Sequence, residues 1–592
     1  MKHPAKTALA AALLSLGLAQ HALAGNLIVS RTVYAGTAST VALGQALPGG
    51  GNAIANGSFP NVFKNETPDP SFGVTSPIYL DQLATNGAYV GTLSINPAQL
   101  VTSFASKSEL ALNLAADGHS LTFMGYAAPQ NTLDVSNSNT AAVFDSTNPV
   151  GSTFPRAVAN VNLGNGSVQA TSVNAYSGNN GRAAVLANGQ YYMVGNAGNG
   201  SAAAAGLCAL SDNTGVQRIA ADSTGNTTPV GAKTQANCTT NGYQRGFSIT
   251  QVGYSADKTG KDDNFRGMAV FNNTLYVTKG SGSNGVNTVY QVGAANALAS
   301  NGVIDNAAIT ILPGFSTLSE KLAETAPTIP TPHPFGLWFA DANTLFVADE
   351  GDGVRLNVAG KVATFAGLQE WTLSGGTWTK VQTFQKGLID QAAATPNGLA
   401  WKVQADGLRN ITGQHNADGT VTIFGTTSTV SDETTHDLGA DPNQIVAITV
   451  GSGSTAANTA FTVLRTAVAG QRFGGVALSA SNTSLSGFVN LGGYVLNRGL
   501  NKFTQQVTLT NNSTSPITGP VNLALDNLSG NTALANSSGA TANHAPLGSP
   551  YYTLSVGDVP AGGSVSATLQ FNKPASGGIS YIPRAITGST AP

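Results

Sequence analysis

The sequence predicts an all-β protein, and a repeated hairpin pattern is the main reason for this fold class. Segment 265–277 has a glycine near its start, a short apolar strand, a polar turn built on Asn, and a second apolar strand. Segments 180–194 and 334–347 repeat this order, and 409–424 and 472–478 keep weaker versions of it. A hairpin repeated at intervals of many tens of residues cannot bury its own faces, so the copies must stack radially. The pattern predicts a β-propeller of six or seven blades.

The last hundred residues show a different strand pattern. Segment 503–511 alternates polar and apolar residues, and short strands are expected at 521–525, 552–556 and 564–571 with Pro and Gly turns between them. Several short alternating strands in a row are typical of an immunoglobulin-like β-sandwich. The expected parts are a signal peptide over 1–24, a β-propeller over 25–485 and an immunoglobulin-like β-sandwich over 488–592.

The N-terminal residues have the features of a secretory signal peptide. Lys2 and Lys6 supply a basic start, 7–18 an apolar core, and 22–24 a cleavage site with small residues. The apolar core is shorter than the roughly 20 residues of a membrane-spanning helix. We therefore expect a secreted or periplasmic chain that begins at Gly25 and has no membrane span.

Strands are then expected along the whole first part of the chain. A strand at 27–34 is well placed to complete the blade that ends near Leu478, which would close the propeller ring by joining its two ends. Further strands or hairpins are expected at 89–95, 110–126, 158–176, 369–373, 378–384, 445–450 and 461–465.

The composition limits the classes of partner. Charged residues make up 9% of the chain and the formal net charge is −2, whereas about 25% of the residues in an ordinary soluble domain are charged. Binding to nucleic acid or to an anionic membrane needs clustered Lys and Arg, so nucleic acid is excluded as a partner. We expect an extracellular ligand that is a small anion, a glycan or a protein.

The chain has two cysteines, Cys208 and Cys238, in a segment rich in Asn, Thr and Ala. In an exported protein such a pair is expected to form a disulfide, which would close a loop of about 30 residues and stabilise it by about 3 kcal/mol. Two free thiols are the alternative. The spacing lacks the Cys-x-x-Cys pattern of zinc sites.

Familiar catalytic motifs are missing, and no catalytic residue is predicted. Segment 280–285 fits Gly-x-Gly-x-x-Gly, but it lies between two strands and is interpreted as a glycine hairpin. The densest acidic cluster contains Asp349, Glu350 and Asp352, which could offer three carboxylates to Ca²⁺. A blade-connecting turn is the alternative, because glycine-rich turns occupy the same place in other copies of the hairpin.

Four arginines sit at the start of the repeated hairpin: Arg182, Arg266, Arg409 and Arg472. Equivalent residues of a propeller gather near one mouth of its channel, so the four guanidinium groups could form an anion funnel for phosphate or carboxylate. The alternative is that each Arg braces its own blade by bonding to backbone carbonyls of the next. His333 has a comparable position and is interpreted as structural.

The hairpin copies, particularly 334–353, resemble the blades of NHL-repeat and SMP-30/gluconolactonase-like propellers. Segments 508–513, 519–526 and 559–565 resemble the C-terminal immunoglobulin-like modules of secreted bacterial proteins. The lactonase branch implies a divalent metal held by Glu, Asn and Asp of separate blades, and these ligands have no assigned positions here. The predicted function is therefore extracellular binding at the propeller mouth, and the alternative is a metal-dependent hydrolase of lactonase or phosphoesterase type.

Overall fold

The structure is a computed structural model, in which the predicted signal peptide lies outside the described residues. The described residues are 27–37, 40–42, 45–46, 73–104, 106, 109–116, 118, 120–148, 150–163, 166–198, 207–233, 262–280, 285–298, 302–320, 331–353, 365–396, 399, 401–416, 418–431, 441–478, 489–511, 517, 519–542 and 546–587.

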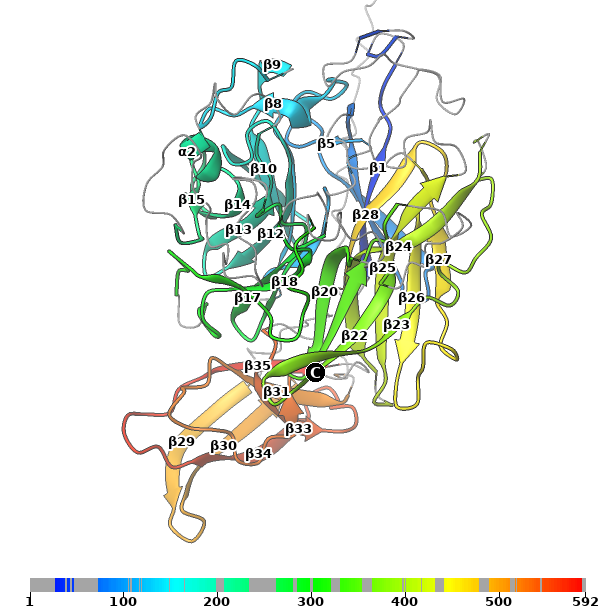
Figure 1. Ribbon diagram of the computed structural model, residues 1–592. Coiled ribbons are helices and arrows are strands. Elements are labelled where there is room, and N and C mark those ends of the chain that lie inside the picture. Colours follow the sequence, from blue (N-terminus) through cyan, green and yellow to red (C-terminus); the bar gives the residue numbers. More distant parts are fainter. Residues whose placement is uncertain are drawn as a thin grey trace, which may run out of the picture.

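Strands dominate the described chain, which confirms the all-β prediction (Figure 1). Six four-stranded antiparallel sheets are found in the described part of 27–478. The first sheet contains β28 (Gln471–Leu478), β1 (Leu27–Val33), β3 (Ile78–Leu83) and β4 (Tyr89–Ser94). The second sheet contains β6 (Asn113–Leu114), β7 (Ser120–Tyr126), β10 (Arg156–Asn162) and β11 (Val168–Val173). The third sheet contains β12 (Gly181–Ala187), β13 (Gln190–Gly195), β14 (Gly215–Ala220) and β15 (Thr228–Pro229).

The other three of these sheets follow in chain order. The fourth sheet contains β16 (Met268–Phe271), β17 (Thr274–Lys279), β18 (Thr288–Val292) and β19 (Ile309–Ile311). The fifth sheet contains β20 (Pro334–Asp341), β21 (Thr344–Asp349), β22 (Gly367–Ser374) and β23 (Thr377–Phe384). The sixth sheet contains β24 (Val403–His415), β25 (Val421–Ser431), β26 (Gln444–Val450) and β27 (Thr462–Thr466).

The repeated hairpins form where the sequence predicts them, and asparagine supplies tight turns. β12 and β13 are joined at Asn188 and Gly189, whose φ angles are 50° and 69°. β16 and β17 are joined at Asn272 and Asn273, with φ angles of 46° and 52°. Positive φ at both central residues matches the twist of the strands, and Asn and Gly adopt it more readily than other residues. The weaker copy at 409–424 differs, because β24 already begins at Val403.

The N-terminal strand joins the two ends of this part of the chain. β1 pairs antiparallel with β28, from Leu27 opposite Leu478 to Val33 opposite Gln471. Its other edge pairs with β3. The predicted pairing between 27–34 and the strand that ends near Leu478 is therefore confirmed.

The innermost strands of the six sheets contact one another in a closed cycle. β6 contacts β12, and the contacts continue through β16, β20, β24 and β28 back to β6. Each pair of neighbouring sheets also shares an apolar cluster, so the faces that one hairpin cannot bury are buried by the next sheet. Representative buried pairs from the six clusters are Leu80 and Phe123, Val158 and Tyr191, Tyr192 and Val277, Val289 and Leu345, Phe346 and Ile423, and Val29 and Ile445.

Two further antiparallel sheets follow after Val489 and enclose a common apolar core. One contains β29 (Val489–Asn497), β30 (Lys502–Thr510) and β34 (Ser564–Asn572), and the other contains β32 (Gly539–Ala540), β33 (Pro550–Ser555), β31 (Val521–Asp526) and β35 (Ile582–Thr587). Val507 and Phe571 of the first and Leu523 of the second belong to one cluster. Figure 1 shows these C-terminal sheets lying below the six others.

The remaining elements are short. β2 (Thr75–Ser76) pairs with β5 (Thr102–Ser103), and β8 (Ser138–Asn139) pairs with β9 (Val150–Thr153). The described residues also include the short helices η1 (Val135–Asn137) and α2 (Leu207–Ser211). Over the described ranges, no helix has the length and apolar character needed to cross a membrane.

Candidate functional site

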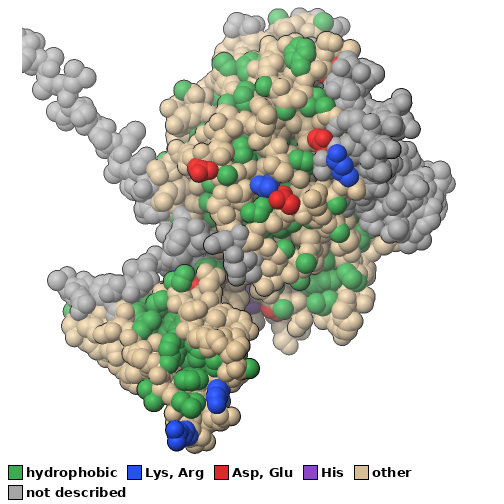
Figure 2. Space-filling model, turned by 90° about the vertical axis from the view of Figure 1, so that its left-hand side faces the viewer, with side chains coloured by type: hydrophobic (Ala, Val, Ile, Leu, Met, Phe, Trp, Pro, Cys, Tyr) green, Lys and Arg blue, Asp and Glu red, His purple; other side chains and the backbone are tan. Residues whose placement is uncertain are grey.

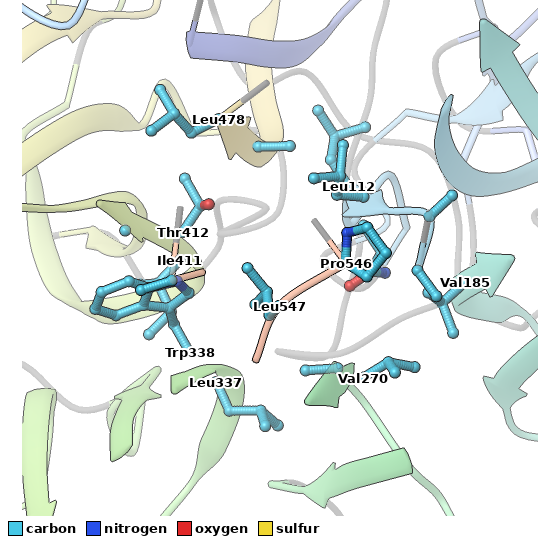
Figure 3. A pocket seen from close by; sticks show the side chains of 18 of the residues that line it. Leu112, Val185, Val270, Leu337, Trp338, Ile411, Thr412, Leu478, Pro546 and Leu547 are labelled. Atoms are coloured by element: carbon cyan, nitrogen blue, oxygen red, sulfur yellow. The ribbon is translucent and has the colours of Figure 1, made fainter. Parts of the chain in front are cut away.

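Apolar side chains from all six sheets gather around the axis of the six-sheet ring, toward the C-terminal ends of its innermost strands. A cavity of about 140 Å³ lies there. Each innermost strand, or the residue beside it, contributes a lining side chain, as Figure 3 shows. These residues are Leu112, Val185, Val270, Trp338, Ile411 and Leu478.

A segment of the C-terminal sheets, residues 546–549 between β32 and β33, lies at this end of the axis and is called the Leu547 loop. Pro546 and Leu547, between β32 and β33, line the same cavity and lie at the centre of the ring in Figure 3. Leu547 packs against the apolar cluster that contains Phe271 and Leu337. The next residue, Gly548, has a φ of 83°, and a Cβ placed on it would lie 2.5 Å from Asn272 Oδ1. Gly548 therefore lies closely against the β16–β17 turn at this end of the axis.

The opposite end of the axis carries the predicted arginines. Arg182 and Arg472 are the second residues of β12 and β28, and Arg266 lies two residues before β16. Arg409 lies in the middle of β24 rather than at the start of a hairpin, because that strand is 13 residues long and bulged. All four side chains are buried, with exposed fractions of 1–3%.

Arg182 and Arg472 make hydrogen bonds that run between sheets. Arg182 Nη1 donates to Phe265 O at 3.0 Å and to Asn264 Oδ1, both of which precede β16 of the fourth sheet. Arg472 Nη1 donates to Ser106 O, in the segment before β6 of the second sheet. Arg182 and Arg472 thus bond to backbone carbonyls next to the following sheet, as expected if each arginine braces its own blade. The anion-binding role of the four arginines stays a prediction.

Arg409 makes an ion pair with the fifth sheet. Its Nε donates to Glu350 Oε2 at 3.1 Å, and the two side chains are 3% and 15% exposed. A pair held away from water is costly to break, because the remaining partner is left with an uncompensated charge. Glu350 is thus held by Arg409, and it lies close enough to Asp349 to raise the pKa of that carboxyl group.

The carboxylate of Asp349 organises a turn. Oδ2 accepts hydrogen bonds from His333 N at 2.7 Å and Gln369 Nε2 at 3.0 Å, and Oδ1 accepts one from Gly351 N at 3.0 Å. Burial raises the pKa of Asp349. Asp352 is exposed. Within the described residues, no group of three or more His, Cys, Asp or Glu could hold a metal ion. The Ca²⁺ role of Asp349, Glu350 and Asp352 stays a prediction.

A buried cluster of charged side chains lies beside the second sheet and was not predicted from the sequence. Glu109 Oε2 accepts hydrogen bonds from Thr102 Oγ1 at 2.7 Å and Ser103 N at 3.0 Å, and Oε1 accepts one from the Tyr126 hydroxyl. Burial raises the pKa values of Glu109 and Tyr126 and lowers the pKa of Arg156 to about 10.

Arg156 and Arg182 connect this cluster to its surroundings. Arg156 Nη2 donates to Ser136 O at 2.7 Å, and Arg182 lies close enough to lower the pKa of Tyr126, against the larger effect of burial. Glu109 is an isolated acid in a serine-rich segment and Arg156 follows a proline. No spacing in the sequence therefore indicates that Glu109 and Arg156 lie close together in the fold.

The predicted disulfide involves residues at the limit of the described chain. Cys208 lies in α2, and Cys238 lies outside the described residues. The disulfide stays a prediction.

No protein-family model matches the chain, and no curated protein matches it at a significant level. Among solved structures, it is similar to the Synechocystis apocarotenoid oxygenase (7% identity, 69% of this chain, 59% of that chain, TM-score 0.21). It is also similar to a Bacillus subtilis glycoside hydrolase family 43 arabinoxylan arabinofuranohydrolase (10% identity, 83% and 96% covered, TM-score 0.25) and to the phage phi92 endosialidase (9% identity, 81% and 64% covered, TM-score 0.23).

The chain thus spans 59% of the length of the oxygenase. These neighbours include β-propeller-like proteins, and the likeness is weak. At TM-scores of 0.25 and below it does not identify the function of this chain.

Proposed function

We propose that the six four-stranded sheets are the blades of a β-propeller and that the two C-terminal sheets form an immunoglobulin-like module. The closed cycle of contacts between innermost strands supports the first part. The pairing of β1 with β28 supports it independently, because propeller rings are usually closed by a strand from the other end of the chain.

We further propose that the protein is an exported binding protein whose ligand is recognised at the arginine end of the axis. The observation that carries this proposal is that the Leu547 loop occupies the opposite end of the axis. A ligand that approaches along the axis would meet the end where Arg182, Arg266 and Arg472 lie. Guanidinium groups held by neighbouring sheets need little reordering when they bind an anion, so phosphate or a small carboxylate is the proposed ligand class.

The test is a thermal shift measured in phosphate, succinate and chloride at equal ionic strength. Phosphate or succinate is expected to raise the melting temperature of the wild-type protein by about 2–4 °C, because a ligand that binds only the folded state stabilises it. Arg266→Gln is expected to abolish the shift. Arg218→Gln is the matched control, since Arg218 pairs with Asp305 on the outer side of the third sheet and should leave the shift unchanged.

Two results would contradict the proposal. Equal melting temperatures in all three salts would contradict the proposed anion site. They would not bear on the proposed propeller architecture. A stoichiometric divalent metal in the purified protein, whose removal lowers the melting temperature, would instead favour the metal-dependent hydrolase.

A further inference from the structure

We propose that the tip of the β29–β30 hairpin binds the surface of an anionic lipid bilayer. Four of the thirteen large apolar side chains that are exposed in the described chain lie within 494–500, at this tip. Single apolar residues are normal on a protein surface, whereas a cluster of them marks an interaction site. The hairpin points away from the six-sheet ring (Figure 1), so this proposal does not depend on the anion site proposed above. The four side chains are Tyr494, Val495, Leu496 and Leu500, with exposed fractions of 37%, 64%, 37% and 50%.

The apolar side chains of the tip lie on both faces of the hairpin. Tyr494 is opposite Gln505 and packs edge-on against Phe571, with ring centroids 5.6 Å apart, so it lies on the core side of the sheet. Leu496 shares this face, because side chains alternate along a strand, and Val495 lies on the other face. A flat protein surface would cover one face of the hairpin, whereas a layer of lipid can surround both.

Three basic side chains lie at the same end of the hairpin. Arg498 is in the turn, and Lys502 begins β30 opposite Asn497 of β29. The neighbouring strand β34 brings the third, since Lys502 is also opposite Asn572 and Lys573 follows directly. Figure 2 shows Lys and Arg side chains beside hydrophobic ones at the far end of the C-terminal sheets. The sequence shows no such cluster, because the three residues come from separate segments.

The acidic residues of this part of the chain do not neutralise the tip. Between 489 and 587 there are two of them, Asp526 and Asp558. Asp526 is buried and makes an ion pair with Arg584, whose Nε lies 2.6 Å from Asp526 Oδ2. Asp558 lies between β33 and β34 at the opposite end of the sheets, where its Oδ1 accepts a hydrogen bond from Gly519 N at 2.9 Å. The tip is therefore both apolar and positively charged.

An anionic lipid surface matches both of these properties. Each Lys or Arg near such a surface strengthens binding by about fivefold, and apolar side chains are buried where headgroups meet acyl chains. Tyrosine favours the same depth. The contact should be shallow, because β29 is an edge strand whose outer backbone groups need water. A second copy of the chain fits less well, since the bulge between Leu491 and Tyr494 interrupts the edge along which another strand would pair.

The test is flotation of the full chain with two kinds of vesicle, phosphatidylcholine alone and an equimolar mixture with phosphatidylglycerol. We expect tighter binding to the mixed vesicles by about tenfold or more, and loss of this difference at about 1 M salt, which screens the charges. Lys502→Gln should weaken binding to the mixed vesicles about fivefold and leave binding to phosphatidylcholine unchanged. Leu500→Ser should weaken binding to both kinds about tenfold, because it removes apolar surface.

Two matched controls separate the tip from the rest of the surface. Val556→Ser removes an apolar side chain that is 87% exposed at the opposite end of the C-terminal sheets. Arg218→Gln removes the same charge as Lys502→Gln, but from the outer side of the third sheet. Neither control should change vesicle binding. All four substituted side chains are at least partly exposed, so the variants should fold, and their melting temperatures without lipid check this.

The proposal is overturned if the wild type does not bind the mixed vesicles, or if Lys502→Gln and Arg218→Gln weaken binding equally. It is also overturned if the chain forms dimers without lipid and Leu500→Ser abolishes them in sedimentation velocity, since the tip would then contact a second copy. Leu500→Trp gives a second readout, because its added emission should shift to the blue with the mixed vesicles. An unshifted emission would place the lipid contact elsewhere.

Discussion

Asp134 is a buried carboxyl group without a charged partner. It precedes η1 in a left-handed conformation, with a φ of 59°, and its side chain is fully buried. Oδ1 accepts a hydrogen bond from Asn137 Nδ2 at 2.5 Å, and Oδ2 has no partner within the described chain. Burial raises the pKa of Asp134 to about 8, although the bond from Asn137 acts in the opposite direction.

This carboxyl group predicts that the protein loses stability as the pH rises. An aspartate in the unfolded chain ionises near pH 4. Below about pH 4 the Asp134 carboxyl group is protonated in both the folded and the unfolded state, so it does not lower the free energy of unfolding. Between about pH 4 and 8 the carboxyl group ionises in the unfolded state but stays protonated in the folded state. The free energy of unfolding should therefore fall by a few kcal/mol over this range. Asp134→Asn should remove much of the fall, as measured by urea denaturation at pH 5 and pH 8.

Asp222→Asn is the control for this prediction, because Asp222 is an exposed carboxylate. Its pH dependence should match that of the wild type. Equal pH dependence in Asp134→Asn and the wild type would contradict an elevated pKa at Asp134. Glu109 and Asp349 also have pKa values raised by burial, so part of the fall should persist in Asp134→Asn.

Among the strands, features that depend on neighbouring residues in the sequence were predicted better than features that depend on contacts between distant segments. Hairpins follow from short-range rules, and turns such as Asn188-Gly189 lie where alternating strands and turn residues meet. The long β24 escaped prediction, since its bulges let it continue past Arg409 without a turn signal. The Glu109 and Arg156 cluster escaped prediction because hydrogen bonds between separate segments leave no spacing in the sequence.

β1 is the strand whose loss should affect the ring most. Leu27, Ile28 and Val29 are fully buried, and Ser30 Oγ donates to Leu110 O at 2.8 Å, in the segment before β6 of the second sheet. Deleting 26–35 removes both the central pairing of the first sheet and this contact with the next sheet. We expect the deletion to abolish cooperative unfolding, as measured by circular dichroism during heating. Adding a peptide of residues 26–35 should restore it in part, and a deletion variant that melts like the wild type would contradict ring closure by β1.

For the whole molecule, the axis is chemically asymmetric. One end carries buried arginines, and at the other end apolar side chains and a loop from the C-terminal sheets line a cavity. Figure 2 shows few charged side chains on the face that it presents and hydrophobic side chains gathered on the C-terminal sheets. Exposed apolar residues of those sheets include Val495, Leu496 and Val556. The C-terminal sheets thus contact the ring directly, through the partly buried Leu547 at the axis, which no local sequence signal predicts.

The Leu547 contact predicts that the two parts of the protein unfold together. Because Leu547 is packed in an apolar cavity, Leu547→Asp would place a charge there and should break the contact. The wild type is expected to give one calorimetric transition, and Leu547→Asp two, since domains with a small interface unfold independently once that interface is lost. Val556→Asp is the control, because Val556 is 87% exposed and its replacement should leave one transition. A single unchanged transition in Leu547→Asp would show that the loop does not couple the two parts. In either case the phosphate-induced shift should persist, because the proposed anion site lies at the other end of the axis.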